Sequence, residues 1–187
     1  MTFAHLSSPR ATSPLTFACL LSAFLAAARA PAKENGAGEK RESREQTKLV
    51  RQAADGTVSL HARVAAIHGT TVRYEPQPNK NTIGYWTKVE DWVSWDFEIA
   101  KPGRFKVEIL QGCGKGSGGS EVDFSVGEQT LEVTVKDTGG FQNFENREIG
   151  ELKLEAPGRY TLKVKPKKKP GVAVMDLREV KLSPVKR

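Results

Sequence analysis

Apolar and polar residues alternate with a period of two along most of the chain after Ser59, and this pattern limits the fold. In the clearest run, residues 92–99, apolar side chains occupy every second position. The same period recurs in residues 105–109, 122–126, 131–135 and 160–164. Alternation puts successive side chains on opposite faces of a strand, so each run predicts a strand with one buried face. No stretch here has the 3.6-residue period of an amphipathic helix. The chain is therefore predicted to be all-β.

Turn signals separate the predicted strands. Pro102-Gly103 and Pro157-Gly158 each precede a run that begins with an inward aromatic residue. Eight to ten short strands with one apolar face predict two packed antiparallel sheets, a jelly-roll sandwich. The alternation changes phase near Gly150 and again between residues 177 and 180, and each change predicts a β-bulge.

The first 30 residues have the features of a secretory signal peptide. Arg10 precedes an apolar run at residues 15–27, and Ala28-Arg29-Ala30 fits a small-x-small cleavage site. The run is shorter than the ~20 residues of a membrane span, and no later stretch is apolar enough to span. We therefore predict a secreted or periplasmic protein, with an uncleaved N-terminal anchor as the alternative.

Charge divides the remainder into a linker and a domain. Residues 31–55 are dense in both signs of charge and predict a disordered charged linker, which leaves 56–187 as the β-sandwich domain. The whole chain carries +7, and the domain has 21 basic and 17 acidic residues. Five lysines between 163 and 169 account for this excess, and we expect them at one hairpin tip. Nucleic-acid binding is not expected, because that needs a distributed basic stripe.

No constellation of residues predicts catalysis or a cofactor. Gly114, Gly116 and Gly119 fit G-x-G-x-x-G, but a strand follows where a dinucleotide site needs a helix. The two histidines of the predicted domain, His61 and His68, have no recognisable partners for a triad or a zinc site. Signal cleavage would remove Cys19 and leave Cys113 as a lone thiol, which we expect to be buried. The chain is therefore predicted not to be an enzyme.

Aromatic residues outside the strand interiors are the best candidates for ligand contact. Five of them fall in predicted loops or strand ends: Tyr85, Trp86, Trp92, Phe141 and Phe144. Exposed rings can stack on the apolar faces of sugars, and the amide of Asn143 can bond sugar hydroxyls. The alternative is that these rings close the end of the sandwich, since large aromatic residues are usually at least partly buried.

Four segments, in order, resemble a known family. They are Leu60–Gly69, Asp91–Trp95 followed by Pro102–Val107, Thr138–Phe144 and Asp176–Leu182. Together they resemble the galactose-binding-like jelly rolls, and within them the carbohydrate-binding modules of families 6 and 35. Ile83–Thr87 also resembles β modules attached to secreted bacterial sulfatases and fucosidases. The likeness covers about residues 57–184.

The resemblance implies a ligand site and raises the question of calcium. It assigns sugar contacts to Phe141, Phe144, Asn143, Tyr85 and Trp86. Many members hold calcium with acidic residues on the first strand and an aspartate on the last. Here the first-strand positions are His61 and Arg63, which leaves Asp176 as the only matching candidate ligand. Because calcium prefers several oxygen ligands, a structural calcium is not expected.

Together these features predict an exported, non-catalytic accessory module that binds carbohydrate through loop aromatics. The lysine-rich segment suggests acidic or sulfated glycans. The alternative is a structural or protein-interaction β-sandwich with no sugar site. The sequence leaves the oligomeric state open.

Overall fold

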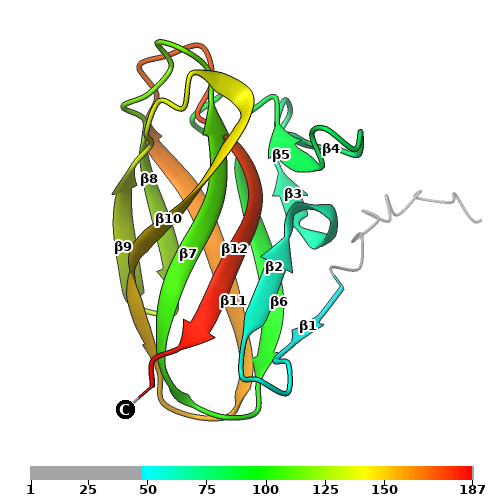
Figure 1. Ribbon diagram of the computed structural model, residues 1–187, viewed down its shortest axis with the longest axis vertical. Coiled ribbons are helices and arrows are strands. Elements are labelled where there is room, and N and C mark those ends of the chain that lie inside the picture. The colour runs from blue at the N-terminus through cyan, green and yellow to red at the C-terminus, as the bar shows by residue number, and fades with distance from the viewer. Residues whose placement is uncertain (1–47, 187) are drawn as a thin grey trace, which may run out of the picture. The chain divides into compact units, whose positions relative to one another are not determined.

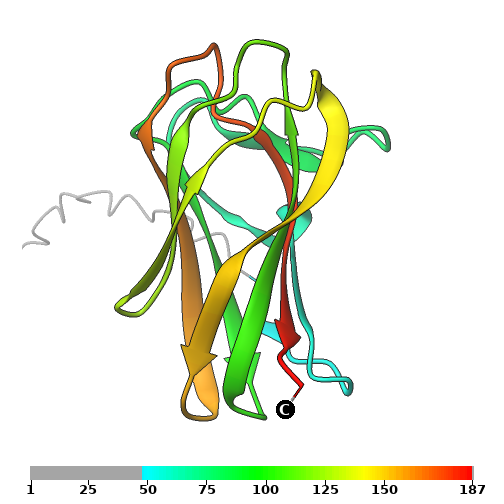
Figure 2. The same cartoon turned by 60° about the vertical axis from the view of Figure 1, so that its left-hand side comes forward.

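The computed structural model describes residues 48–186, which form two six-stranded sheets packed face to face (Figures 1 and 2). The strands are β1 (Val50–Arg51), β2 (Val58–His61), β3 (Ala66–His68), β4 (Arg73–Glu75), β5 (Thr82–Gly84), β6 (Trp92–Ile99), β7 (Gly103–Cys113), β8 (Glu121–Val126), β9 (Gln129–Thr134), β10 (Gly140–Leu154), β11 (Gly158–Lys168) and β12 (Asp176–Pro184). The one helical element in this part of the chain is a 3-10 turn, η1 (Ala62–Val64).

The two sheets, called A and B here, are antiparallel with one exception. Sheet A has the order β1-β6-β11-β8-β9, with β3 also paired to β6. Sheet B has the order β10-β7-β12-β5-β4, with β2 also paired to β12. Only the β1–β6 pairing is parallel among the described strands. The predicted all-β, two-sheet jelly-roll sandwich is confirmed.

The core lies between the sheets and is built from the inward phase of the alternating runs. Trp95, Phe97, Phe105 and Phe124 are all at most 1% exposed. Each such side chain stabilises the fold by about 1.5–3 kcal/mol through its removal from water. The one polar atom of the Trp95 ring, Nε1, donates to the carbonyl of His61 at 2.9 Å. Burial of this ring therefore leaves no unpaired donor.

Both predicted β-bulges are present. The β10–β7 register shifts between Glu148 and Gly150, and the β12–β7 register shifts between Leu177 and Glu179. A third shift, which the sequence did not predict, lies at the start of β10. There the four residues 141–144 stand opposite the single Gly112 of β7. This wide bulge lifts the segment out of the sheet at the end where the loops gather.

The predicted linker, residues 31–55, was drawn too long at its C-terminal end. Residues 49–55 belong to the folded domain, because Val50 and Arg51 pair with β6 as β1. The Gln52 side chain fixes the following turn, since its Oε1 accepts from the backbone N–H groups of Ala100 and Lys101. The predicted signal peptide and residues 31–47 lie outside the described residues. Between residues 48 and 186, no helix is long and apolar enough to cross a bilayer.

The prediction for the lysine-rich segment was also wrong. It does not form a hairpin tip, because β11 extends to Lys168 and is paired on both sides, with β6 and with β8. Alternation along β11 turns Lys163, Lys165 and Lys167 to the outer face of sheet A. These lysines therefore lie on the face of a sheet between neighbouring strands.

Candidate functional site

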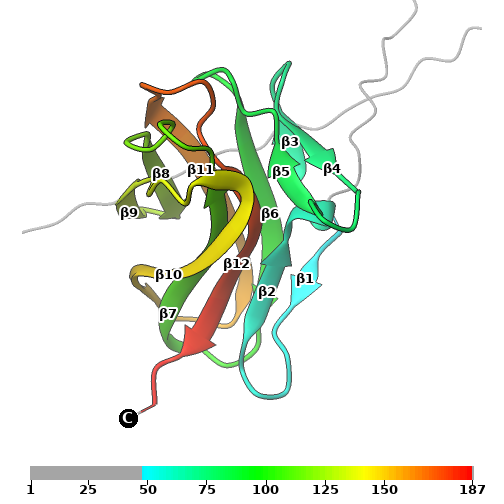
Figure 3. The ribbon, with the colours of Figure 1, turned by 45° about the horizontal axis from the view of Figure 1, so that its top comes forward.

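The loops that follow β5, β9 and β11 gather at one end of the sandwich, together with the β4–β5 hairpin (Figure 3). Between them lies a pocket of about 270 Å³, called the end pocket here. Residues far apart in the chain line it: Glu75, Lys80, Tyr85, Thr87, Phe141, Gln142, Val172, Ala173 and Asp176. The pocket therefore exists only in the folded domain.

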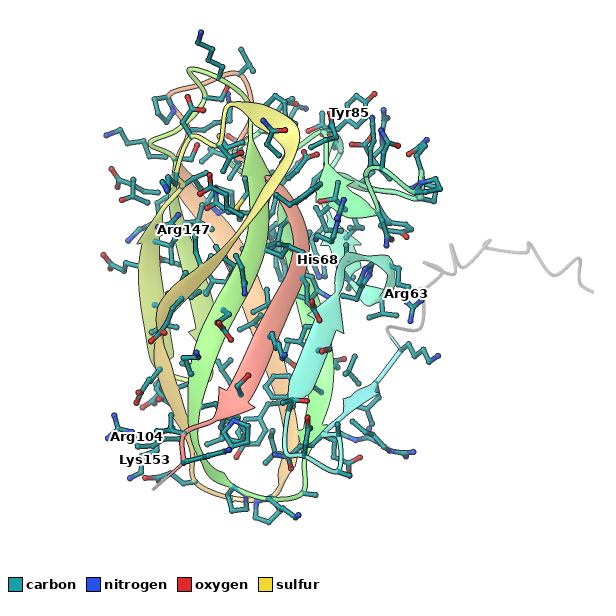
Figure 4. The ribbon with its side chains drawn as sticks, viewed as in Figure 1. Arg63, His68, Tyr85, Arg104, Arg147 and Lys153 are labelled. Atoms are coloured by element: carbon teal, nitrogen blue, oxygen red, sulfur yellow. The ribbon has the colours of Figure 1, made fainter. Side chains whose placement is uncertain are left out.

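Tyr85 forms the most exposed aromatic wall of the end pocket. Its side chain is 48% exposed, and it projects at the loop end of the domain (Figure 4). Its φ of 53° is unusual for a residue with a side chain. Such backbone strain persists only where surrounding contacts fix it, and it is concentrated at functional sites. The guanidinium of Arg73 lies 3.5 Å from the ring centroid and holds the ring in place.

Phe141 reaches the end pocket because β10 bulges and β7 makes room for it. A Cβ at Gly112 would collide with the carbonyl of Phe141, and one at Gly114 would lie 2.5 Å from the Phe141 ring. The glycine-rich stretch forms the end of β7 and the connection to β8. Its first glycines have the additional role of letting the bulged segment pack closely. The half-buried Phe141 thereby turns toward the pocket with its neighbour Gln142.

Two carboxyl groups and one ammonium form the polar wall. Glu75 is 7% exposed and accepts from Lys80 Nζ at 2.6 Å. Asp176 is 4% exposed, and its Oδ2 has no hydrogen-bond partner among the described residues. Burial, followed by the nearby charge of Glu75, raises the pKa of Asp176 to about 7. A Cβ at Gly84 would collide with Glu75 and lie 3.1 Å from Asp176 Oδ1, so only glycine lets both acids approach.

The end pocket thus combines an exposed ring, a second ring and a set of buried hydrogen-bonding groups. An unpartnered buried oxygen such as Asp176 Oδ2 costs free energy unless a ligand or water bonds it. This wall can accept hydrogen bonds from a ligand, while the rings can pack on an apolar face. The arrangement suits a small polar ligand that has one flat apolar side.

Trp86 is not a ligand contact, contrary to the sequence-based prediction. Its side chain is fully buried, and its Nε1 donates to the carbonyl of Asp91 at 2.8 Å. Its backbone carbonyl accepts from Val174, which ties the β5–β6 loop to the β11–β12 loop. Trp86 closes the core beneath the end pocket and cannot stack on a sugar.

Asn143 and Phe144 lie on the bulge outside the lining of the end pocket. The side chain of Asn143 donates to the carbonyl of Thr138 at 3.2 Å and so braces the loop. The Phe144 ring is half-buried, with the guanidinium of Arg178 at 3.6 Å from its centroid. Arg178 also donates to the carbonyl of Lys80. Both residues therefore contact the segments that surround the end pocket without lining the pocket.

Trp92 lies apart from the end pocket, on the outer face of sheet A. It is half-buried and stacks on His68, with ring centroids 3.6 Å apart. The predicted aromatic contacts therefore divide into three groups. Tyr85 and Phe141 share the pocket, Trp86 and Phe144 pack in or behind it, and Trp92 belongs to another surface.

Sequence reasoning missed the polar wall. Glu75 ends β4, Lys80 lies in the loop between β4 and β5, and Asp176 begins the last strand. Asp176 was predicted only as a calcium ligand, and nothing in the local sequence links it to Glu75. The one usable signal is Gly84, a glycine whose missing side chain leaves space for two acids.

The residues present do not fit the calcium site that the resemblance implies. At the positions that the resemblance assigns to acidic ligands, His61 at the end of β2 and Arg63 in η1 carry no carboxylate, and His61 Nδ1 accepts from the backbone N–H of Arg63. Asp176 has Glu75 beside it, but the Lys80 ammonium occupies that carboxylate. Among residues 48–186, no group of three or more His, Cys, Asp or Glu side chains could hold a metal ion.

The fold matches solved carbohydrate-binding modules. A family 35 module from Clostridium thermocellum superposes with a TM-score of 0.56 at 13% identity, covering 69% of this chain and 98% of that chain. The C-terminal family 6 module of the laminarinase LamC from Zobellia galactanivorans gives a TM-score of 0.52 at 17% identity, covering 68% and 98%. These likenesses show that the chain shares the jelly-roll fold of these modules.

Relatives in sequence are fewer. A stretch of 89 residues is 28% identical to the β-agarase AgaA of Microbulbifer thermotolerans. The match covers 46% of this chain but only 20% of that enzyme, so the chain spans a small part of its relative's length. Residues 66–186 match the family described as "Domain of unknown function (DUF5077)". Because this match covers most of the chain, the protein belongs to the DUF5077 family.

Proposed function

We propose that this protein is an exported, non-catalytic module that binds carbohydrate in the end pocket. One observation carries the proposal: an exposed ring, Tyr85, shares a pocket with Phe141 and with the buried carboxyl of Asp176, whose Oδ2 has no hydrogen-bond partner among the described residues. Sugars present an apolar C–H face and a rim of hydroxyl donors, which are the two features this pocket complements. The match of the fold to carbohydrate-binding modules supports the same reading.

The size of the end pocket indicates modest affinity. Its volume of about 270 Å³ lies just below the ~300–1,000 Å³ typical of small-molecule sites. A site of this size contacts a short stretch of a glycan, so little surface is buried on binding. We expect weak binding to single sugars and tighter apparent binding to polysaccharides that present many copies.

The charge of the end pocket favours an uncharged sugar. Two carboxyl groups face one ammonium, and that ammonium is already paired with Glu75. A carboxylate or sulfate on the ligand would meet Asp176 and Glu75 in a partly desolvated site, where repulsion is strong. Agarose, the polysaccharide for which the agarase relative is named, is the first ligand to test.

The non-catalytic part of the proposal rests on the histidines. His68 Nε2 lies 2.9 Å from Ser94 Oγ, which is the spacing of a nucleophile–base pair. However, Ser94 is only 7% exposed, and the His68 ring is stacked flat on Trp92. Within residues 48–186 no acid bonds His68 to orient it as a triad requires. The contact is better explained as a structural one.

The test is a polysaccharide microarray probed with the full chain, followed by calorimetry on any neutral glycan that binds. Tyr85→Ala should abolish binding while leaving the unfolding temperature nearly unchanged, because the side chain is half exposed. Trp92→Ala is the matched control, an aromatic residue removed from another surface. Neutral-glycan binding that survives Tyr85→Ala would rule out the end pocket.

A structural or protein-interaction module is the second candidate. The observation that favours it is the burial of Trp86 together with the cover of Arg178 over Phe144, which is how end plugs behave. Absence of binding to every glycan on the array would leave this candidate standing and overturn the first.

A further inference from the structure

The outer face of sheet A gathers aromatic and basic residues that the end pocket does not use. Strands β3, β6 and β11 are adjacent in this sheet. His68 pairs directly with Trp92, and Val164 pairs with Val93. The next residue along β11, Lys165, therefore lies beside Trp92. The three outward side chains form one row across three strands.

Contacts within this row hold its side chains in place. The His68 and Trp92 rings are stacked 3.6 Å apart at an angle of 11°. Lys165 Nζ lies 4.5 Å from the centroid of the Trp92 ring, within the range of a cation–π contact. His68 is fixed further by its hydrogen bond to Ser94. A lysine and an imidazole are thus positioned on either side of one indole.

The lysines near this row differ from others on the same strand in having no acidic partner. Lys167 pairs with Asp123 and Glu132, both at 3.1 Å, and Lys168 pairs with Glu121 at 3.2 Å. By contrast, the three lysines beside this row, Lys88, Lys163 and Lys165, have no carboxylate within 4.0 Å among residues 48–186. Lys88 donates instead to the hydroxyl of Thr70. Positive charge is therefore left uncompensated beside Trp92.

A shallow basin adjoins the row. It has a volume of about 500 Å³ and is lined by His68, Gly69, Thr70, Lys88, Glu90, Asp91 and Trp92. Of its two acids, Asp91 is engaged by the backbone N–H groups of residues 70–72 and is buried. Glu90 is the one exposed carboxylate in the lining, against three unpaired lysines at or beside the basin.

We propose that His68, Lys88, Trp92, Lys163 and Lys165, together called the Trp92 patch, form a second binding surface for an anionic polysaccharide. The positive groups would contact sulfate or carboxylate groups, and Trp92, with His68 on one side and Lys165 on the other, would hold both side chains in position. This surface is independent of the end pocket, whose own charge disfavours anions.

The extent of the positive region favours a glycan over a nucleic acid. The positive region is limited, because Asp123 of β8 stands opposite Lys165 and pairs with Lys167, and β6 carries Asp96 and Glu98 farther along the same face. A nucleic-acid duplex needs a basic stripe that follows two backbones. A single polysaccharide strand needs only a few cations spaced along its length.

His68 gives this surface a pH dependence. Its pKa is lowered, first by burial and then by the charges of Lys165 and Lys163. The other charged groups that face it are Lys88, Glu90 and Asp91 in the adjoining loop. A bound anion would offset the lysines and raise the pKa of His68, so binding takes up protons. Affinity for a polyanion should therefore increase as the pH falls toward 6.

The experiment measures binding of the full chain to dextran sulfate, to polygalacturonate and to uncharged dextran at low salt. The expected result is binding to the charged polymers only, weakened by added salt. Lys163→Gln with Lys165→Gln should lower the affinity about five- to tenfold, as expected for two exposed charges. Sulfated and carboxylated probes distinguish which anion the patch prefers.

The same strand provides a matched control. Lys167→Gln with Lys168→Gln removes the same charge from lysines that already have acidic partners, and it should change the affinity less than twofold. Equal losses in the two double variants would show a nonspecific charge effect and overturn the proposal. So would equally tight binding to a short DNA duplex, or undiminished binding by the Lys163/Lys165 variant. Tyr85→Ala should leave polyanion binding intact, so a failure here is separable from a failure of the end pocket.

Discussion

Cys113 and Asp176 have buried positions that change the chemistry of each side chain. The Cys113 thiol is fully buried at the end of β7, as predicted. Burial, aided by the charges of Asp137 and Asp176, raises its pKa to about 11. At neutral pH it is a neutral thiol and a poor nucleophile. The lone cysteine of the described domain therefore acts as a small apolar core residue.

Asp176 should make the wild-type protein less stable as the pH rises. Its pKa in the folded state, about 7, lies above the ordinary value of 3.8. The folded state then binds the proton more tightly, so the contribution of Asp176 to stability is fully present below pH 4 and is lost as the pH rises through 7. Asp176→Asn removes this penalty and should stabilise the protein at pH 8 by about 2–4 kcal/mol, with little effect at pH 4.

Urea unfolding at the two pH values measures this difference. Asp137→Asn is a useful comparison, because hydrogen bonds from Gly139 and Gly116 lower the pKa of that exposed carboxylate. Asp137→Asn should therefore lower the stability of the protein at pH 8. Parallel stability curves for wild type and Asp176→Asn would contradict the prediction.

The sequence could indicate which aromatic residues lie in loops but not which of them are exposed, and their role as sugar contacts stays a prediction. Tyr85 and Phe141 are large rings in segments rich in turn residues, and the structure places both in the end pocket. Trp86 follows Tyr85 directly, and the sequence offers no reason to assign one ring to the core and its neighbour to solvent. The positive φ of Tyr85 makes that distinction, and it depends on contacts with distant strands.

At the scale of elements, Asp91 organises the connection from β3 to β4. Its carboxylate accepts from the backbone of Thr70, Thr71 and Val72 and from the Thr71 hydroxyl. A Cβ at Gly69 would collide with this carboxylate, so the turn requires glycine. Burial alone would raise the pKa of Asp91, but the hydrogen bonds outweigh it and the pKa is lowered.

Asp91→Asn should destabilise the domain by about 2–4 kcal/mol. The NH2 group of the new amide would face buried backbone N–H groups, and two donors cannot form a hydrogen bond with each other. The wild-type carboxylate contributes stability above its ordinary pKa of 3.8, and this contribution is lost as the pH falls below that value. The gap between wild type and variant in thermal unfolding should thus close toward pH 2. Asp96→Asn, which affects one bond from Thr161, is the control and should cost less.

The sequence predicted long elements well and short ones poorly. Alternation located β6, β7, β8, β9 and β11, and the phase slips at Gly150 and after Leu177 located two bulges. Strands of two or three residues, such as β1, β4 and β5, are too short to show a period. They form because neighbouring strands offer them partners. The polar wall of the end pocket was missed for this reason, since Glu75 and Gly84 belong to such strands.

At the scale of the whole domain, the end pocket and the ion pair of Arg104 with Glu151 lie at opposite ends. Tyr85 lies at the loop end, whereas Arg104 and Lys153 lie near the C-terminal end of the described chain (Figure 4). Arg104 pairs with Glu151 across β7 and β10, away from both proposed surfaces. The galactose-binding-like jelly roll thus holds its loops on a rigid body. A protein attached after β12 would leave the end pocket accessible.

The parallel strand β1 has a consequence for colloidal behaviour. β6 lies near one edge of sheet A. Its outer side is covered only by two short strands, β3 near Trp92 and β1 at Phe97 and Glu98. An uncovered edge is a template for pairing with another chain. Val50→Pro with Gln52→Ala, which detaches β1, should therefore increase concentration-dependent light scattering on gentle heating far more than it lowers the unfolding midpoint. Arg51→Ala, which leaves the backbone pairing in place, should scatter like wild type. The short strand β1 would then matter less for the stability of the sandwich than for preventing fibrillar self-association.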